Sequence, residues 1–227
     1  MIETRANFGF MLVGLIVLWL IAPVLALTSS DTAKIVENVA LGAAMVLGAW
    51  SLSKERKFFL IAASITSIAV ICSLIAFLTG NELAIFLVLT LQILFWLMAA
   101  WFVGRHVLAP GPVDINRIAG GICIYMIAAV VWAFAYILVY HFVPGAFNGL
   151  ESVPFEGQLS EMLYFSYVTL TTLGYGDVTP AHPVTRWMAQ FEAVFGQLYI
   201  AILIASLVGM WIASATRSDT TDGEGGG

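Results

Sequence analysis

Long runs of apolar residues alternate with short polar stretches over most of the chain. A helix needs roughly 20 consecutive apolar residues to cross the hydrocarbon core of a bilayer. Because a chain inside a membrane must satisfy its backbone hydrogen bonds internally, we expect each long run to be a spanning helix. A further run, Leu159–Leu170, is too short to cross. The long runs are Phe8–Leu27, about Ile35–Leu52, Phe58–Leu78, Leu83–Val103, about Ile115–Val143 and Val184–Ala213.

Composition supports a membrane protein. Hydrophobic residues make up 61% of the 227 residues and charged residues only 10%, whereas a soluble domain is about 45–50% apolar and about 25% charged. The expected fold class is therefore an all-α membrane protein with six transmembrane helices. A re-entrant helix and its following loop, between the fifth and sixth spans, complete it. The net charge of −5 argues against nucleic acid as a partner.

The pattern divides the chain into three parts. Residues 1–108 are expected to form a four-helix transmembrane domain of unknown role. Residues 109–215 hold the fifth and sixth spans with the half-length segment between them. Residues 216–227 are polar and end in glycines, which predicts a disordered tail.

Basic residues predict the orientation in the membrane. Cytoplasmic loops carry an excess of Lys and Arg. With both termini cytoplasmic, two basic residues, Lys34 and Arg186, lie outside. The remaining seven lie inside: Arg5, Lys54, Arg56, Lys57, Arg105, Arg117 and Arg217. We therefore expect a multi-pass protein of the plasma (inner) membrane, with the loop between the fifth and sixth spans on the outer side.

The segment Thr169–Asp177 lies between the half-length run and the last span, and it reads TLTTLGYGD. Non-helical backbone at membrane depth is tolerated where it is buried in protein or lines a polar path. Gly174 and Gly176 allow backbone conformations that are closed to other residues. Successive carbonyl groups can then point toward one axis and bind a dehydrated cation.

This segment resembles the selectivity filter of the potassium channel family, in which Thr-Val-Gly-Tyr-Gly-Asp stands where this chain has Thr172-Leu-Gly-Tyr-Gly-Asp177. The resemblance covers about residues 113 to 215. It implies that the carbonyls of Thr172, Leu173, Gly174 and Tyr175 replace the hydration shell of K⁺, with Gly176 completing the filter. Leu173 replaces the usual Val or Ile, and its carbonyl rather than its side chain would face the ion.

The same resemblance implies roles for residues around the filter. Tyr164 and Phe165 match aromatic positions that pack behind it, and Asp177 matches the residue at its outer end. Gly196 matches a hinge glycine of the inner helix. One chain supplies one filter segment, so the resemblance also implies a homotetramer in a lipid bilayer. K⁺ is then the permeant ion, and no cofactor is expected.

The fourth span contains no basic residue between Leu83 and Val103. Moving one charge through the membrane field yields only about 2.3 kcal/mol per 100 mV, so a voltage sensor needs several charges. We therefore expect a channel that is not gated by a charged voltage sensor. Residues 1–108 could serve as a packing domain around the pore or as a sensor of lipid or of another hydrophobic ligand.

Glu192 is the one ionisable residue well inside a span. An acid at that depth is a candidate functional residue. It could support the filter through a hydrogen bond to the pore helix, or it could act as a protonation switch. The sequence alone leaves both interpretations open.

A K⁺-selective channel is thus the leading prediction. The alternatives are a weakly selective cation channel and a non-conducting membrane sensor or scaffold subunit. A transporter is less well supported because such a design needs four pore segments in one chain, and this chain has one. We do not expect an enzyme, because the sequence shows no nucleophile–base pair and no metal-binding pattern.

Overall fold

The computed structural model describes residues 8–26, 41–46, 48, 56–109, 114–150 and 158–223. Its elements are mostly helices, in agreement with the predicted class of helical membrane protein. They run in the order α1 Gly9–Ala26, α3 Arg56–Thr79, α4 Glu82–Val107, α5 Ile115–Phe142, β1 Phe147–Asn148, α6 Gln158–Leu170, β2 Thr179–Pro180 and α7 Pro183–Gly223. Residues 41–46 and 48 are also helical, while the rest of the expected second span lies outside the described residues.

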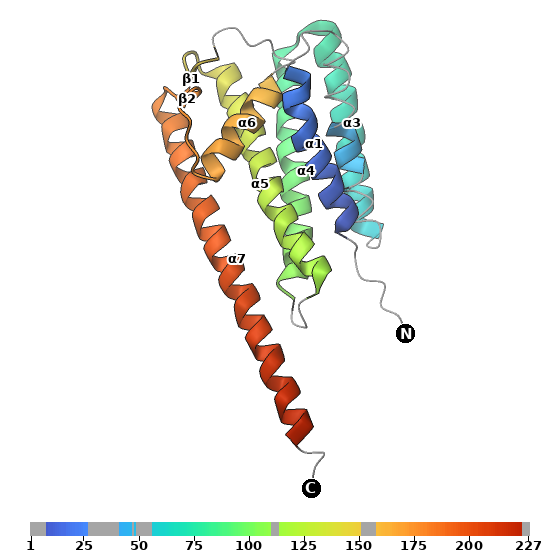
Figure 1. Cartoon of the computed structure of the whole chain (residues 1–227). Helices are drawn as coiled ribbons and strands as arrows, with labels where there is room; N and C mark the ends of the chain where they lie inside the picture. The colour runs from blue at the N-terminus through green and yellow to red at the C-terminus, as the bar shows by residue number, and fades with distance from the viewer. Residues whose placement is uncertain are drawn as a thin grey trace.

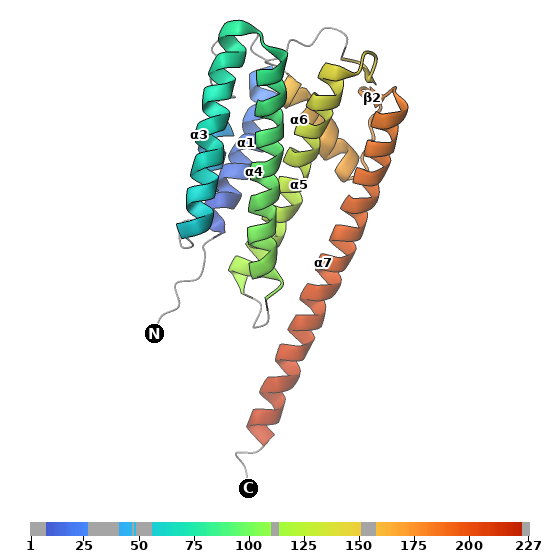
Figure 2. The same cartoon turned by 180° about the vertical axis from the view of Figure 1, so that it is seen from behind.

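Helices α1, α3, α4 and α5 lie roughly side by side as a bundle, and α7 leans away from it (Figures 1 and 2). α4 packs against both α3 and α5, and α1 packs against α5 and α6. Glycine permits the closest of these approaches, because a Cβ on Gly120 of α5 would lie 2.6 Å from Val107 and 3.0 Å from Phe8. The bundle therefore shares one apolar core, with Phe8, Phe95 and Trp96 almost fully buried.

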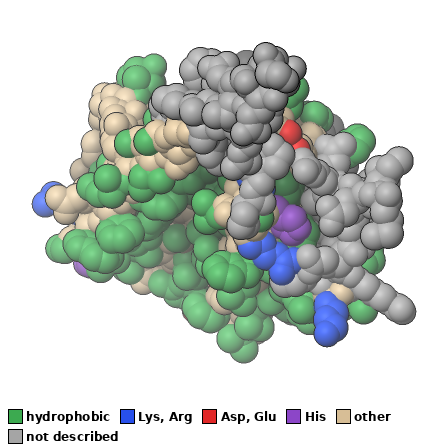
Figure 3. All heavy atoms as spheres, turned by 90° about the horizontal axis from the view of Figure 1, so that it is seen from below, with side chains coloured by type: hydrophobic (Ala, Val, Ile, Leu, Met, Phe, Trp, Pro, Cys, Tyr) green, Lys and Arg blue, Asp and Glu red, His purple; other side chains and the backbone are tan. Residues whose placement is uncertain are grey.

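The outer surface of the bundle is apolar as well. α4 and α5 are each long and apolar enough to cross a membrane. On α3, the exposed side chains include Val70, Ile71 and Leu78. Viewed from the end at which α3 and α5 begin, hydrophobic side chains make up most of the described surface in view (Figure 3). Such a surface suits a hydrocarbon environment.

Charged residues gather at the two ends of the bundle rather than along it. Lys57 in the first turn of α3, Arg105 in the last turn of α4 and Arg117 in the first turn of α5 share one end, which is the lower end in Figure 1. Glu82 begins α4 at the opposite end, where α6 also begins. Within α4, the basic residues stand only in the last turn, so the middle of the expected fourth span is uncharged.

α6 enters the bundle from the upper end and stops part of the way through it, and the chain then turns back to β2 at the same end (Figure 1). β1 and β2 form a small antiparallel sheet in which Phe147 pairs with Pro180 and Asn148 pairs with Thr179. An all-helical expectation did not include this sheet. It joins the turn after α5 to the turn before α7.

The last helix is longer than predicted. α7 continues to Gly223, beyond the expected end of the span at Ala213. Residues 216–223, which were expected in a disordered tail, are therefore helical, and residues 224–227 lie outside the described part. The physical reason is that neither proline nor glycine, the residues that most often end a helix, occurs between Met210 and Asp222.

α7 passes very close to the end of α6. A Cβ on Gly196 would lie 2.1 Å from the carbonyl oxygen of Leu170, a distance that no real side chain could keep. Glycine at this position lets the backbone of α7 approach the C-terminus of α6. The structure thus gives Gly196 a packing role, and its role as a hinge stays a prediction.

We predict that Gly196→Ala destabilises the protein by about 1–3 kcal/mol, because the added methyl group forces α6 and α7 apart. Thermal unfolding in detergent measures the effect. Gly209→Ala is the matched control, since it changes a glycine of the same helix that has no atom within 4 Å of the added Cβ. Equal unfolding midpoints for the two variants would show that the close approach does not matter.

Candidate functional site

The segment that follows α6, residues 171–177, lies on the surface of the chain. Residues 171–177 are all exposed, although they follow α6 directly and α7 packs against the end of that helix. The side chains of Leu173 and Tyr175 are 54% and 68% exposed. A single chain therefore leaves one side of this segment uncovered.

Hydrogen bonds fix the direction of the peptide groups in this segment. The amides of Leu173 and Gly174 both donate to the carbonyl of Val168 on α6, at 2.9 and 3.3 Å. In a trans peptide, the carbonyl of one residue points opposite to the N–H of the next. The described chain contains no cis peptide. The carbonyl groups of Thr172 and Leu173 therefore point away from α6.

The backbone of the segment has a positive φ angle at every second residue from Thr172 to Gly176. Thr172, Gly174 and Gly176 have φ angles of 58°, 58° and 83°. In an ordinary strand, successive carbonyls point to opposite sides, whereas alternation of the sign of φ allows neighbouring carbonyls to share one side. Glycine adopts positive φ at no steric cost, and Thr172 is the only other described residue that adopts it.

The inner end of the segment carries a polar contact with α7. The side-chain amide of Gln197 donates to the hydroxyl oxygen of Thr172 at 3.1 Å. Gln197 follows Gly196, so the close approach of α7 to α6 also brings this amide to the segment. Nothing in the sequence connects Gln197 to Thr172, which lies 25 positions away.

The outer end is held by Tyr164 of α6. Its phenol donates to the carboxylate of Asp177 at 2.6 Å. This hydrogen bond is the main cause that lowers the pKa of Asp177 below its ordinary value, and it raises the pKa of Tyr164 to about 12. Asp177 is also close to the turn after β1, because a Cβ on Gly149 would clash with the carbonyl oxygen of Asp177.

Phe165, the neighbour of Tyr164, points to the other side of α6. Its ring packs edge-on against Tyr136 of α5 and Phe147 of β1, with centroids 5.0 and 5.3 Å away. The two aromatic residues that were predicted to pack behind the segment thus do different things. Tyr164 contacts the segment itself, and Phe165 anchors α6 to α5 and to the small sheet.

Glu192 of α7 lies behind α6 and is completely buried. Its two carboxyl oxygens contact the hydroxyl groups of Tyr136 and Ser166, each at 2.5 Å. Sequence reasoning identified Glu192 but missed both partners. Ser166 could have been suspected because it is a hydroxyl residue on the apolar short helix that leads into the segment, but nothing in the sequence connects Tyr136 to a residue 56 positions away.

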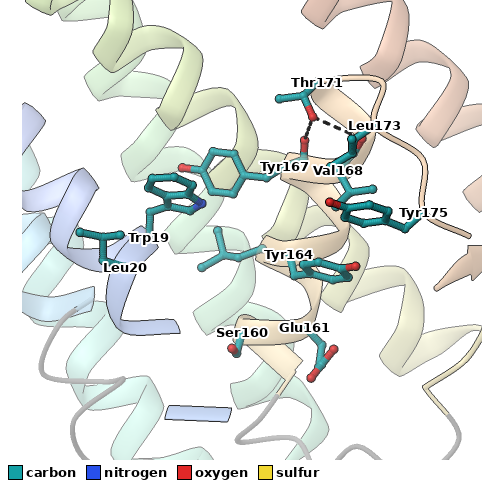
Figure 4. A pocket seen from close by; sticks show the side chains of 11 residues that line it. Trp19, Leu20, Ser160, Glu161, Tyr164, Tyr167, Val168, Thr171, Leu173 and Tyr175 are labelled. Atoms are coloured by element: carbon teal, nitrogen blue, oxygen red, sulfur yellow. Dashed lines mark hydrogen bonds between the residues drawn. The ribbon is translucent and has the colours of Figure 1, made fainter. Parts of the chain in front are cut away.

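An apolar pocket of about 620 Å³ borders the segment on the side of α1. Its wall includes Trp19 of α1, Tyr167 of α6, and Leu173 and Tyr175 of the segment (Figure 4). The rings of Trp19 and Tyr167 are 5.9 Å apart. The first helix therefore reaches the short helix that carries the segment.

The chemistry of the site is that of oxygen ligands from the backbone. Within the described residues, no group of three His, Cys, Asp or Glu side chains could hold a metal ion. The exposed carbonyls of the segment and the hydroxyl of Thr172 are hard oxygen ligands, which suit an alkali cation.

Comparison with known proteins agrees with this chemistry. Residues 121–212 match a family whose description is "Ion channel". The chain is 34% identical over 70 residues to Two-pore potassium channel 5 of Arabidopsis thaliana, a match that covers 31% of this chain and 16% of that protein. It is 43% identical over 53 residues to Protein LctB of Bacillus caldotenax, covering 23% and 39% of the two chains.

A third relative is Two pore potassium channel c of Oryza sativa subsp. japonica, which is 33% identical over 89 residues, or 36% of this chain and 19% of that protein. The matched segments thus span well under half of each relative's length.

We predict that Tyr164→Phe raises the pKa of Asp177 toward its ordinary value, because the phenol hydrogen bond to the carboxylate is lost. A depressed pKa stabilises the folded protein above the ordinary pKa of the acid, and this contribution disappears as the pH falls through the lowered value. In the variant, Asp177 should accept its proton at a higher pH. Carbon NMR of labelled aspartate measures the titration.

The control for this titration is Tyr140→Phe, which removes a phenol that donates to the carbonyl of Leu150 instead. It should leave the pKa of Asp177 unchanged. The same titration curve for Asp177 in wild type and in Tyr164→Phe would contradict the prediction.

Proposed function

We propose that this chain is a K⁺-selective channel, because residues 121–212 match an ion channel family and two plant potassium channels are among its relatives. K⁺ passes down its gradient along an axis that is lined by the carbonyls of Thr172, Leu173, Gly174 and Tyr175, with the Thr172 hydroxyl at the inner end. The observation that carries the proposal is the direction of the Leu173 and Gly174 amides, both of which point back to Val168. The carbonyls of the same peptide groups then face the open side and can replace water around the ion.

Selectivity requires that this ring of oxygens holds its position against the ion. The amides of Leu173 and Gly174 donate to α6, Tyr164 holds the outer end through Asp177, and Gln197 contacts the inner end. In our proposal, Tyr164 and Asp177 support the filter directly. Phe165, which packs against α5, and Glu192, which contacts Ser166, support it through the short helix.

We further propose a homotetramer, because one side of the filter is open in a single chain. One chain supplies one wall, and an ion needs oxygens all around it. α7 presents an apolar stripe with the spacing of one helix face, and each of its side chains is more than half exposed: Trp187, Phe191, Val194, Leu198 and Ile202. The pocket between α1 and α6 adjoins the filter residues Leu173 and Tyr175. In our proposal, this stripe and this pocket lie at the contacts between four copies.

The membrane arrangement that fits this function has six spans, with both termini cytoplasmic and the filter opening to the outer side. The basic residues Lys57, Arg105 and Arg117 at one end of the bundle support this orientation, since cytoplasmic ends are rich in Lys and Arg. Because α4 carries its basic residues only in the last turn, the channel is not driven by a charged voltage sensor. The plasma (inner) membrane is the proposed location.

Reversal potentials in planar bilayers test the function. With K⁺ on one side and Na⁺ on the other, the wild-type reversal potential should lie close to the K⁺ equilibrium potential. Gly174→Ala should abolish selectivity or conduction, because Ala at a φ of 58° costs about 1–2 kcal/mol in each subunit. A wild-type current that reverses near zero would instead indicate a weakly selective cation channel.

Gly80→Ala is the matched control. Gly80 has a φ of 62° in the turn between α3 and α4, and nothing lies within 4 Å of its added Cβ, as is also true for Gly174. Both substitutions therefore introduce the same backbone strain. If Gly80→Ala lost selectivity as Gly174→Ala does, the effect would come from folding and not from the filter.

A substitution in the apolar stripe of α7 tests whether four chains associate through it. We predict that Val194→Trp reduces the mass of the detergent-solubilised complex from four chains to fewer, because a bulky ring does not fit a close contact between helices. Val70→Trp on the exposed face of α3 is the control and should leave the mass at four chains. An unchanged mass for Val194→Trp would assign the stripe to lipid.

A further inference from the structure

The buried cluster around Glu192 contains one more hydrogen-bond contact than its hydroxyl groups can serve. The phenol oxygen of Tyr136 lies 2.5 Å from one carboxyl oxygen of Glu192, and the hydroxyl oxygen of Ser166 lies 2.5 Å from the other. The same Ser166 oxygen lies 2.9 Å from the carbonyl oxygen of Ala129 on α5. All three contacts join two oxygens at hydrogen-bond distance.

The number of hydrogens limits how these contacts can be made. Each oxygen–oxygen contact needs one hydrogen between its atoms. Tyr136 and Ser166 each carry one hydroxyl hydrogen, and the Ala129 carbonyl carries none. Two hydrogens cannot serve three contacts. If Ser166 donates to Ala129, the contact between Ser166 and Glu192 can be filled only by a hydrogen on the carboxyl group.

The burial of Glu192 also favours a protonated carboxyl group. Glu192 is completely buried in the part of α7 that runs beside α6. Its side-chain partners in the described structure are two neutral hydroxyl groups, so no positive charge among them balances an ionised carboxylate. A buried charge without a counter-charge is costly, above all in a membrane protein.

We propose that Glu192 is a protonated carboxylic acid that donates to Ser166, while Ser166 donates to Ala129 and Tyr136 donates to Glu192. The chain of hydrogen bonds joins α7, α6 and α5 behind the filter. Glu192 is thereby a positioning residue, because Ser166 lies on the short helix whose Val168 carbonyl anchors the filter amides. The assignment of a proton to Glu192 does not depend on the proposed function, whereas the positioning role of Glu192 rests on that function.

The titratable groups that face Glu192 are few. From α5 they are Tyr136, which contacts it, and Tyr125, which acts on it electrostatically. α6 contributes the hydroxyl group of Ser166, which does not titrate. Both tyrosines are neutral in ordinary buffers. A pH-dependent change in the cluster in that range therefore reports on Glu192 itself.

Infrared spectroscopy of the purified full-length protein tests the proton directly. At neutral pH, wild type should show the carbonyl stretch of a protonated carboxylic acid, which is separate from the bands of carboxylates. Glu192→Gln should remove this band, and Glu82→Gln, which changes an exposed acid at the start of α4, should keep it. Absence of the band in wild type would overturn the proposal.

The second test uses glutamine as the neutral match of the protonated acid. Its amide group can donate to Ser166 and its oxygen can accept from Tyr136, so Glu192→Gln should fold and retain K⁺ over Na⁺ selectivity. Ser166→Ala, which breaks the chain of hydrogen bonds, should lose selectivity or lower the unfolding midpoint. A glutamine variant that fails to fold, or that behaves like Ser166→Ala, would also overturn the proposal.

The pH profile separates a positioning role from a merely structural one. As the pH rises, wild-type K⁺ flux into liposomes should fall over the range in which the carboxylic acid band disappears. Glu192→Gln should maintain its flux over the same range. A parallel loss of flux in both proteins would refute the positioning role. A wild type that shows the band but conducts no K⁺ at any pH would refute the proposed function and leave the proton assignment intact.

Discussion

The structure depends on one constraint, which is that backbone carbonyl groups at membrane depth need a partner. Helices satisfy this requirement within themselves, and the segment after α6 does not. The amides of Leu173 and Gly174 donate to the carbonyl of Val168, and the trans geometry of the peptide then turns the carbonyls of Thr172 and Leu173 to the open side. In the proposed channel, a permeant cation is the partner that these carbonyls bind. The short helix, the small sheet and the close approach at Gly196 all serve to hold this one stretch of backbone.

Much of the fold could be predicted because long apolar runs in a sequence indicate membrane helices. The ranges expected for the first, third, fourth and fifth spans agree with α1, α3, α4 and α5 to within a few residues. The short run predicted as a half-length helix, Leu159–Leu170, corresponds to α6 at Gln158–Leu170. The predicted end of the last helix at Ala213 was wrong, because the polar residues after Ala213 do not contain a helix breaker until Gly223. Polarity alone is a weak signal for the end of a helix.

The residues of the site could be predicted only where a short stretch of sequence was enough to identify them. The stretch from Thr172 to Asp177 and its two glycines stand next to one another, and depth in a span was enough to single out Glu192. The contacts that hold these residues come from distant parts of the chain. Tyr136 reaches Glu192 across 56 positions, and Gln197 reaches Thr172 across 25. Such contacts arise from how helices pack, and spacing in a single sequence does not contain that information.

The packing of the first helices favours a structural role for residues 1–108. α1 lies against both α5 and α6, Trp19 meets Tyr167, and the amide of Phe8 donates to the side chain of Asn116 at 2.8 Å. A sensor that moves freely would need a separable surface, whereas these contacts place α1 in the same apolar core as the pore helices. Any stimulus that displaced α1 would therefore act directly on α6. Because α6 anchors the filter amides through Val168, packing and sensing need not be alternatives in this molecule.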